Sequence, residues 1–145
     1  MAYTSGVYVL ELNEEGFYYV GQSTNIEKRI QQHIDGKGSA FCKAHGGVKR
    51  ALLPFTKRRS RLTMWEQAET VHRMIRYGVN KVRGWEYTSC GPLSAADAYS
   101  LRQLVMGTYN LCRKCGRQGH FAKGCKRTAV KWLRTLDSIV NGQEI

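Results

Sequence analysis

A short segment near the C-terminal end, rich in cysteine and glycine, constrains this chain most. Between residues 112 and 125 the spacing is C-x2-C-x4-H-x4-C, formed by Cys112, Cys115, His120 and Cys125. Three thiolates and one imidazole this close in sequence can close a tetrahedron around one Zn²⁺, because the chain has to wrap the metal. Gly116 and Gly119 lie between the ligands, where tight turns need backbone conformations that glycine adopts readily. The segment therefore predicts a structural Zn²⁺ site.

This segment resembles the zinc knuckle of retroviral nucleocapsid and related proteins, with every ligand and both glycines in place. The resemblance implies single-stranded nucleic acid as a partner. The position after the first cysteine, often aromatic in knuckles, is Arg113 here, which leaves Phe121 as the obvious stacking residue. We therefore expect sequence-tolerant binding, with Phe121 stacking on bases and Arg117 and Lys123 contacting phosphates. A knuckle that contacts another protein is an alternative.

Net charge separates this chain from an average globular protein. The formal charge is +12 over 145 residues, and its excess is concentrated in two blocks that contain no acidic residue, 36–65 and 113–136. Such blocks attract polyphosphate and give a salt-dependent affinity through counterion release. A solvated basic face that only confers solubility is the alternative, but two separate blocks, one of them on the knuckle, favour nucleic acid.

The remaining composition indicates a folded, intracellular protein. A hydrophobic share of 42% favours a globular core, and no apolar run is long enough to span a membrane. The first six residues lack a basic segment and an apolar segment, so no secretory signal is expected. Five cysteines, three of them assigned to zinc, fit a reducing compartment, nucleus or cytoplasm.

The hydrophobic pattern predicts an α+β fold, a small antiparallel sheet flanked by helices and followed by the knuckle and a last helix. Residues 7–12 and 17–21 read as a β-hairpin, and a strand is expected near 48–53, ending before Pro54. Helices are expected from a capping box at Thr24, over 61–77, after Ser94, and near 130–140. We divide the chain into a domain at 1–110, the knuckle at 111–127 and a helix at 128–145.

A second pattern lies in the first third of the chain. The tripeptides Gly6-Val7-Tyr8 and Tyr19-Val20-Gly21 fall on the two hairpin strands, and Arg29 and His33 follow on one face of the next helix. This combination resembles the GIY-YIG nuclease family over about residues 5–88. The stretch around Glu66 and Thr70 is similar to a variant in nuclease-like proteins of large DNA viruses, which selects Glu66 over Glu69 and suggests a viral or mobile-element origin.

The resemblance implies a catalytic set of Tyr8, Tyr19, Arg29, His33 and Glu66. In this reading Glu66 holds Mg²⁺ or Mn²⁺, and Arg29 grips the scissile phosphate. Tyr8 accepts the proton of the attacking water with His33 assisting or orienting it, although family members differ over which tyrosine does this. Further contacts to nucleic acid are expected from Gln22, Lys37, Arg58 and Arg59.

We therefore predict a metal-dependent endonuclease that hydrolyses DNA phosphodiester bonds, with the zinc knuckle aiding binding. DNA is favoured over RNA only because the family resemblance is to DNA nucleases. The alternative is a non-catalytic, nucleic-acid-binding adaptor that keeps the fold. Taken singly, the site residues have ordinary explanations: the tyrosines as cross-strand aromatics, and Glu66 as the capping partner of Thr63.

Overall fold

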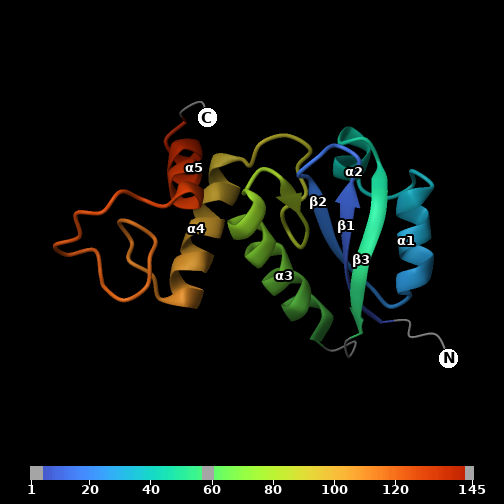
Figure 1. Cartoon of the computed structure of the whole chain (residues 1–145), viewed down its shortest axis with the longest axis horizontal. Coiled ribbons are helices and arrows are strands. Elements are labelled where there is room, and N and C mark those ends of the chain that lie inside the picture. Colours follow the sequence, from blue (N-terminus) through green and yellow to red (C-terminus); the bar gives the residue numbers. More distant parts are fainter. Residues whose placement is uncertain (1–4, 57–60, 143–145) are drawn as a thin grey trace. The chain divides into compact units, whose positions relative to one another are not determined.

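The computed structural model describes residues 5–56 and 61–142, which form two compact units that divide between Pro92 and Leu93. The first unit contains a four-stranded sheet with helices, as Figure 1 shows, so the predicted α+β class is confirmed. The division differs from the sequence-based boundary at residue 110, because α4 (Ala95–Tyr109) packs on α5 (Lys131–Val140) in the second unit. The three functional segments remain a prediction. No helix within the described ranges is long and apolar enough to cross a membrane.

The sheet is built on the hairpin that the sequence predicts, β1 (Gly6–Leu12) and β2 (Tyr18–Ser23). β3 (Val48–Thr56) pairs antiparallel with the other side of β1, and the short β4 (Val82–Arg83) adds a parallel pair to β2. The order is β3-β1-β2-β4. Within the hairpin Tyr8 pairs with Gly21 and Leu10 with Tyr19, so these residues share one face of the sheet.

β3 runs through Pro54 to Thr56, so the prediction that this strand ends before the proline is wrong. β3 is an edge strand, and its pairing with β1 shifts between Val7, which pairs with Phe55, and Val9, which pairs with Leu52. Two residues of β3 therefore oppose one of β1. This bulge at an edge accepts a proline, whose missing N–H would interrupt a regular ladder.

Different helices cover the two faces of the sheet (Figure 1). α1 (Ile26–Ile34) and α2 (Ala40–Ala44) cover one face, over a buried cluster of Tyr8, Leu10, Leu12, Ile26, Phe41 and Cys42. α3 (Leu62–Tyr77) covers the other face, where the rings of Tyr18 and Tyr77 stack with centroids 4.5 Å apart. Alternation along β1 and β2 explains this arrangement, because successive side chains enter opposite layers.

Some helices begin and end at the residues that the sequence predicts, and others do not. Ser94 caps α4 as predicted, accepting a hydrogen bond from a backbone N–H of the first turn, and α3 ends at Gly78, which has a φ of 128°. α1 is capped by Asn25 instead of Thr24, because the side chain of Asn25 accepts the first-turn N–H. α2, capped by Ser39, is a short helix that the sequence analysis did not predict.

Arg83 fixes the conformation of the segment that follows α3. Its side chain is fully buried, and its guanidinium donates to four backbone carbonyls at 2.7–3.0 Å, those of Val79, Val82, Ser89 and Gly91. The same guanidinium lies 5.5 Å from the centre of the Phe41 ring. A buried cation is tolerated here because oxygen atoms surround it, and in return it orders the chain around β4.

Replacing Arg83 with Ala should destabilise the first unit by about 3 kcal/mol, because buried carbonyls lose their donors. Arg83→Lys should recover only part of this loss, since one ammonium cannot reach all four oxygens. The matched control is Arg50→Ala, since Arg50 is 66% exposed and pairs with Glu11 at the surface. Urea unfolding followed by circular dichroism measures these changes. Equal stability of the two alanine variants would contradict this role for Arg83.

Candidate functional site

A hydrogen bond between a strand and a helix forms the centre of the site. The hydroxyl of Tyr8 on β1 lies 2.8 Å from Nε2 of His33 on α1, and both residues are buried. The ring of Tyr19 on β2 approaches the same imidazole, with centroids 5.3 Å apart. The structure therefore brings three of the predicted catalytic residues into one cluster.

Two glycines leave the space that this cluster needs. A Cβ atom at Gly21 would lie 2.3 Å from the Tyr8 hydroxyl oxygen, and one at Gly38 would lie 2.0 Å from Nδ1 of His33. Any side chain at either position would therefore push the ring away. Gly21 is part of the second tripeptide, whereas the sequence analysis did not select Gly38. The signal for it was the pair of glycines that follows α1.

Arg29 is the cation of the cluster. It lies one turn before His33 on α1, is half-buried, and donates to Oε1 of Gln32 at 3.0 Å. Its positive charge opposes the rise that burial causes in the pKa of Tyr8 and of Tyr19, and adds to the fall that burial causes in the pKa of His33. A single guanidinium therefore acts on all three groups, as a residue placed to meet a phosphate would.

Burial sets the protonation of the cluster. Burial raises the pKa of Tyr8, aided by the charges of Tyr19 and Glu66 and opposed by Arg29. Burial likewise raises the pKa of Tyr19. Burial and then Arg29 lower the pKa of His33 to about 4. At neutral pH the site thus contains two protonated phenols and a neutral imidazole.

Glu66 reaches the same end of the hairpin from the other face of the sheet. It is buried on α3, and Nε2 of Gln22, the residue after Gly21 on β2, lies 3.4 Å from its Oε1 and 3.3 Å from Oγ1 of Thr63. Burial raises the pKa of Glu66, and the hydrogen bond from Gln22 opposes this shift. Glu66 also raises the pKa of both tyrosines, so its charge is felt across the sheet.

The other carboxylate on α3, that of Glu69, has a cationic partner. Glu69 forms an ion pair with Arg73 at 2.9 Å on the same helix, which favours Glu66 as the functional acid. The capping explanation for Glu66 does not hold, because α3 begins at Leu62 and no side chain caps it.

The predicted phosphate contacts remain predictions, and the structure places two of the four residues. The amide of Gln22 lies against Glu66, while Lys37 is exposed in the loop after α1. Arg58 and Arg59 lie outside the described residues.

Comparison with known proteins identifies the first part of the chain. Residues 4–73 match the family model of the GIY-YIG catalytic domain. This part of the chain is a GIY-YIG domain. A similar protein is UPF0213 protein BH0048 of Halalkalibacterium halodurans, 25% identical over 89 residues, which cover 61% of this chain and 94% of that protein. No solved structure matches the chain significantly. The family resemblance is confirmed, and the viral variant remains a prediction.

Outside the GIY-YIG domain, the four predicted zinc ligands converge. Their donor atoms, from Cys112, Cys115, His120 and Cys125, all lie within 4.8 Å of one another. The three cysteines are buried, and Sγ of Cys115 lies 3.3 Å from Nε2 of His120. Three thiols and an imidazole at this separation fit a tetrahedral Zn²⁺ site. Among the described residues, these four side chains form the cluster of histidine and cysteine ligands that could hold a metal ion.

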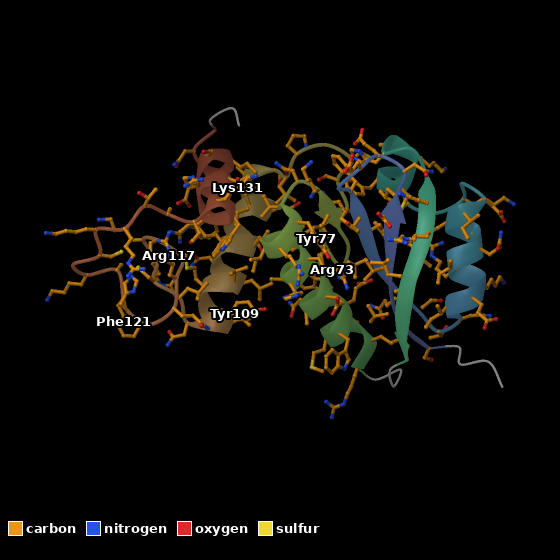
Figure 2. All side chains as sticks on the ribbon, in the orientation of Figure 1. Arg73, Tyr77, Tyr109, Arg117, Phe121 and Lys131 are labelled. Atoms are coloured by element: carbon orange, nitrogen blue, oxygen red, sulfur yellow. The ribbon has the colours of Figure 1, made fainter. Side chains whose placement is uncertain are left out.

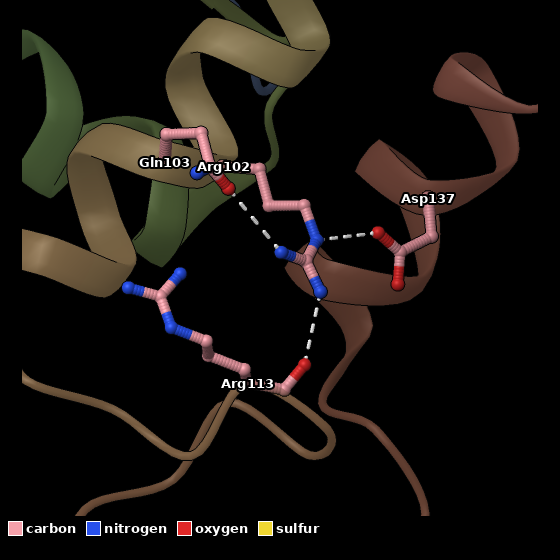
Figure 3. Close-up of polar contacts among 4 residues, drawn as sticks. All are labelled: Arg102, Gln103, Arg113 and Asp137. Carbon is pink, nitrogen blue, oxygen red and sulfur yellow. Dashed lines mark hydrogen bonds and ion pairs between the residues drawn. The ribbon is translucent and has the colours of Figure 1, made fainter. Parts of the chain in front are cut away.

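The metal loop is packed against both helices of the second unit. Arg102 on α4 donates to Oδ1 of Asp137 on α5 at 2.8 Å and to the backbone carbonyl of Arg113 at 2.9 Å (Figure 3). A Cβ atom at Gly116 would lie 2.8 Å from the side chain of Val130 and 3.2 Å from that of Trp132. The loop is therefore an integral part of the second unit.

The metal loop carries a groove of about 630 Å³, lined by His120, Phe121, Lys123, Gly124, Cys125, Lys126 and Arg127. Phe121 is 70% exposed, and Figure 2 shows its ring projecting from the loop. Arg117, predicted to contact phosphate, is half-buried and donates to the carbonyl of Thr128 at 2.7 Å. Lys123 is exposed, as a phosphate contact requires.

Purified protein should contain about one zinc per chain, and Cys115→Ser should remove it, because three ligands hold Zn²⁺ far less tightly than four. Loss of the metal should also change the fluorescence of Trp132, which packs against Gly116. The control is Cys90→Ser, an exposed cysteine that should leave both signals unchanged. Atomic absorption and emission spectra test this, and zinc-free wild-type protein would refute the site.

Proposed function

We propose that this protein is an endonuclease that hydrolyses DNA phosphodiester bonds with a divalent cation, and that the zinc knuckle aids binding of the nucleic acid. The observation that carries the proposal is the Tyr8–His33 hydrogen bond, with Tyr19 and Arg29 beside it. The match to the GIY-YIG catalytic domain supports a nuclease. DNA is favoured over RNA because the family resemblance is to DNA nucleases.

Glu66 is the residue that would hold the divalent cation. Mg²⁺ and Mn²⁺ prefer oxygen ligands and retain several waters, so one carboxylate together with substrate phosphate oxygens suffices. The buried position of Glu66 beside Gln22 fixes the carboxylate without neutralising it by a cationic partner such as the one that Glu69 has. When bound, the cation would supply positive charge to the phosphate oxygens and to the attacking water.

Tyr8 is the proposed proton acceptor. The water oxygen forms a bond to phosphorus while the bond from phosphorus to the leaving sugar oxygen breaks, and the proton of the water passes to the Tyr8 phenolate. The leaving sugar oxygen would take a proton from a solvent water, and the cation that Glu66 would hold supplies positive charge for it. Because burial raises the pKa of Tyr8, its phenolate needs nearby positive charge, which Arg29 supplies in part. Arg29 also grips the phosphate, Tyr19 positions it, and His33 holds Tyr8.

Glu66→Gln should lower the cleavage rate at least about 100-fold while DNA binding persists, because the amide keeps the shape and loses the charge that holds the cation. Glu69→Gln is the matched control, since Glu69 lies one turn further along α3 and pairs with Arg73. Cleavage of labelled DNA with Mg²⁺ or Mn²⁺ measures both variants. If Glu69→Gln abolishes cleavage and Glu66→Gln does not, Glu69 and not Glu66 holds the cation. If the wild type cleaves no DNA, a non-catalytic, nucleic-acid-binding adaptor is favoured.

Changing Lys123 and Lys126 together to Ser should weaken DNA binding and lower the salt slope by about two, because each lost phosphate contact removes about one unit. These lysines line the groove on the metal loop and are exposed, unlike Arg117. Binding is measured on the Glu66→Gln background across salt concentrations, so that no substrate is consumed. An unchanged affinity and slope would instead support a protein partner for the knuckle.

A further inference from the structure

The loop between α1 and α2 contacts the cluster on the side away from Tyr8. We propose that Ser39 is a positioning residue whose backbone amide fixes the tautomer of His33, so that the imidazole can only donate a hydrogen bond to Tyr8. The inference rests on the proposed function for its catalytic consequence, whereas the tautomer itself can be measured without any substrate.

The hydrogen bonds of His33 define the tautomer. The backbone N–H of Ser39 donates to Nδ1 of His33 at 3.3 Å, so Nδ1 must be the nitrogen that carries a lone pair. A neutral imidazole has one N–H, which is therefore on Nε2. Nε2 lies 2.8 Å from the hydroxyl oxygen of Tyr8, so His33 donates and Tyr8 accepts.

The surroundings keep His33 neutral and away from water. The side chain is 2% exposed, and burial lowers its pKa to about 4. The opposite tautomer would place the N–H of Nδ1 against the N–H of Ser39 in a buried space, where two facing donors leave both unsatisfied. Gly38 contributes to this arrangement, because a Cβ there would occupy the position of Nδ1. The loop thus selects one tautomer by geometry.

This tautomer decides what His33 can do for Tyr8. An imidazole that donates through Nε2 and accepts through Nδ1 has no site left to receive the Tyr8 proton. The same N–H stabilises negative charge on the phenolate oxygen once that proton has left. His33 therefore supports Tyr8 as a hydrogen-bond donor and not as the acceptor of its proton.

The side chain of Ser39 has separate tasks. Its Oγ accepts the backbone N–H of Phe41 at 3.0 Å, which caps α2. A side-chain hydrogen bond to Tyr19 partly opposes the rise that burial causes in the pKa of that tyrosine. Backbone and side-chain roles can be separated, because Ser39 has a φ of −65°, the value that proline adopts. Ser39→Pro removes both the N–H and the hydroxyl, whereas Ser39→Ala removes only the hydroxyl, so the difference between the two variants reports on the N–H.

The direct test is a long-range proton–nitrogen correlation spectrum of the imidazole rings in the full-length wild type, with the His33 signals assigned by loss in His33→Gln. We expect the Nε2–H tautomer alone, and the same in Ser39→Ala. An Nδ1–H tautomer in the wild type would overturn the proposal. This measurement decides the matter even if a variant fails to fold.

Variants of Ser39 and Gly38 test the catalytic consequence of the tautomer. In folded Ser39→Pro the Nδ1–H form should become populated and cleavage should slow about tenfold, the effect of one hydrogen bond near the reacting group. Gly38→Ala, which displaces the ring, should also shift the imidazole signals. A folded Ser39→Pro variant with an unchanged tautomer and rate would refute the role of the amide. A wild type without cleavage but with the Nε2–H tautomer would refute only the proposed function.

Discussion

The contact between Tyr8 and His33 is the constraint around which the GIY-YIG domain is organised. It joins the hairpin to α1 through a buried 2.8 Å hydrogen bond, and it is possible only because Gly21 and Gly38 have no side chains. Two buried polar groups satisfy each other there, which removes most of the cost of placing them in the core. The register of the hairpin follows, since a shift of one residue would move Tyr8 to the α3 face.

The sheet also keeps the two opposite charges of the site apart. Arg29 lies with the tyrosines on the side of α1, whereas Glu66 approaches from α3. Had they formed a direct ion pair, the guanidinium would be less available for a phosphate and the carboxylate for a cation. With both held separately, burial keeps the two phenols protonated. An anionic phosphate beside Tyr8 would raise its pKa further, so the proposed reaction needs positive charge beyond that of Arg29.

Local patterns in the sequence predict much of this structure, and tertiary contacts account for the rest. The hairpin, the metal ligands and the residues of the tripeptides follow from periodicity and motif spacing. The passage of β3 through Pro54 depends on the strand lying at an edge, which no local signal reveals. The burial of Arg83 was not predicted, because it depends on how the chain from residue 79 to residue 91 folds its backbone carbonyls around the guanidinium. The division after Pro92 likewise depends on α4 packing with α5.

The second unit shows why packing of the metal loop matters for binding. Arg102 and the contacts of Gly116 attach the loop to α4 and α5, so its groove is carried on helices instead of a free tether. The conformational entropy of the metal loop is then lost partly when the protein folds, so less is lost when a ligand binds. Phe121 stays exposed because the thiolates and His120 face inward, and its ring needs no rearrangement to stack on a base. If the knuckle binds nucleic acid as proposed, this arrangement suits binding without base-specific contacts.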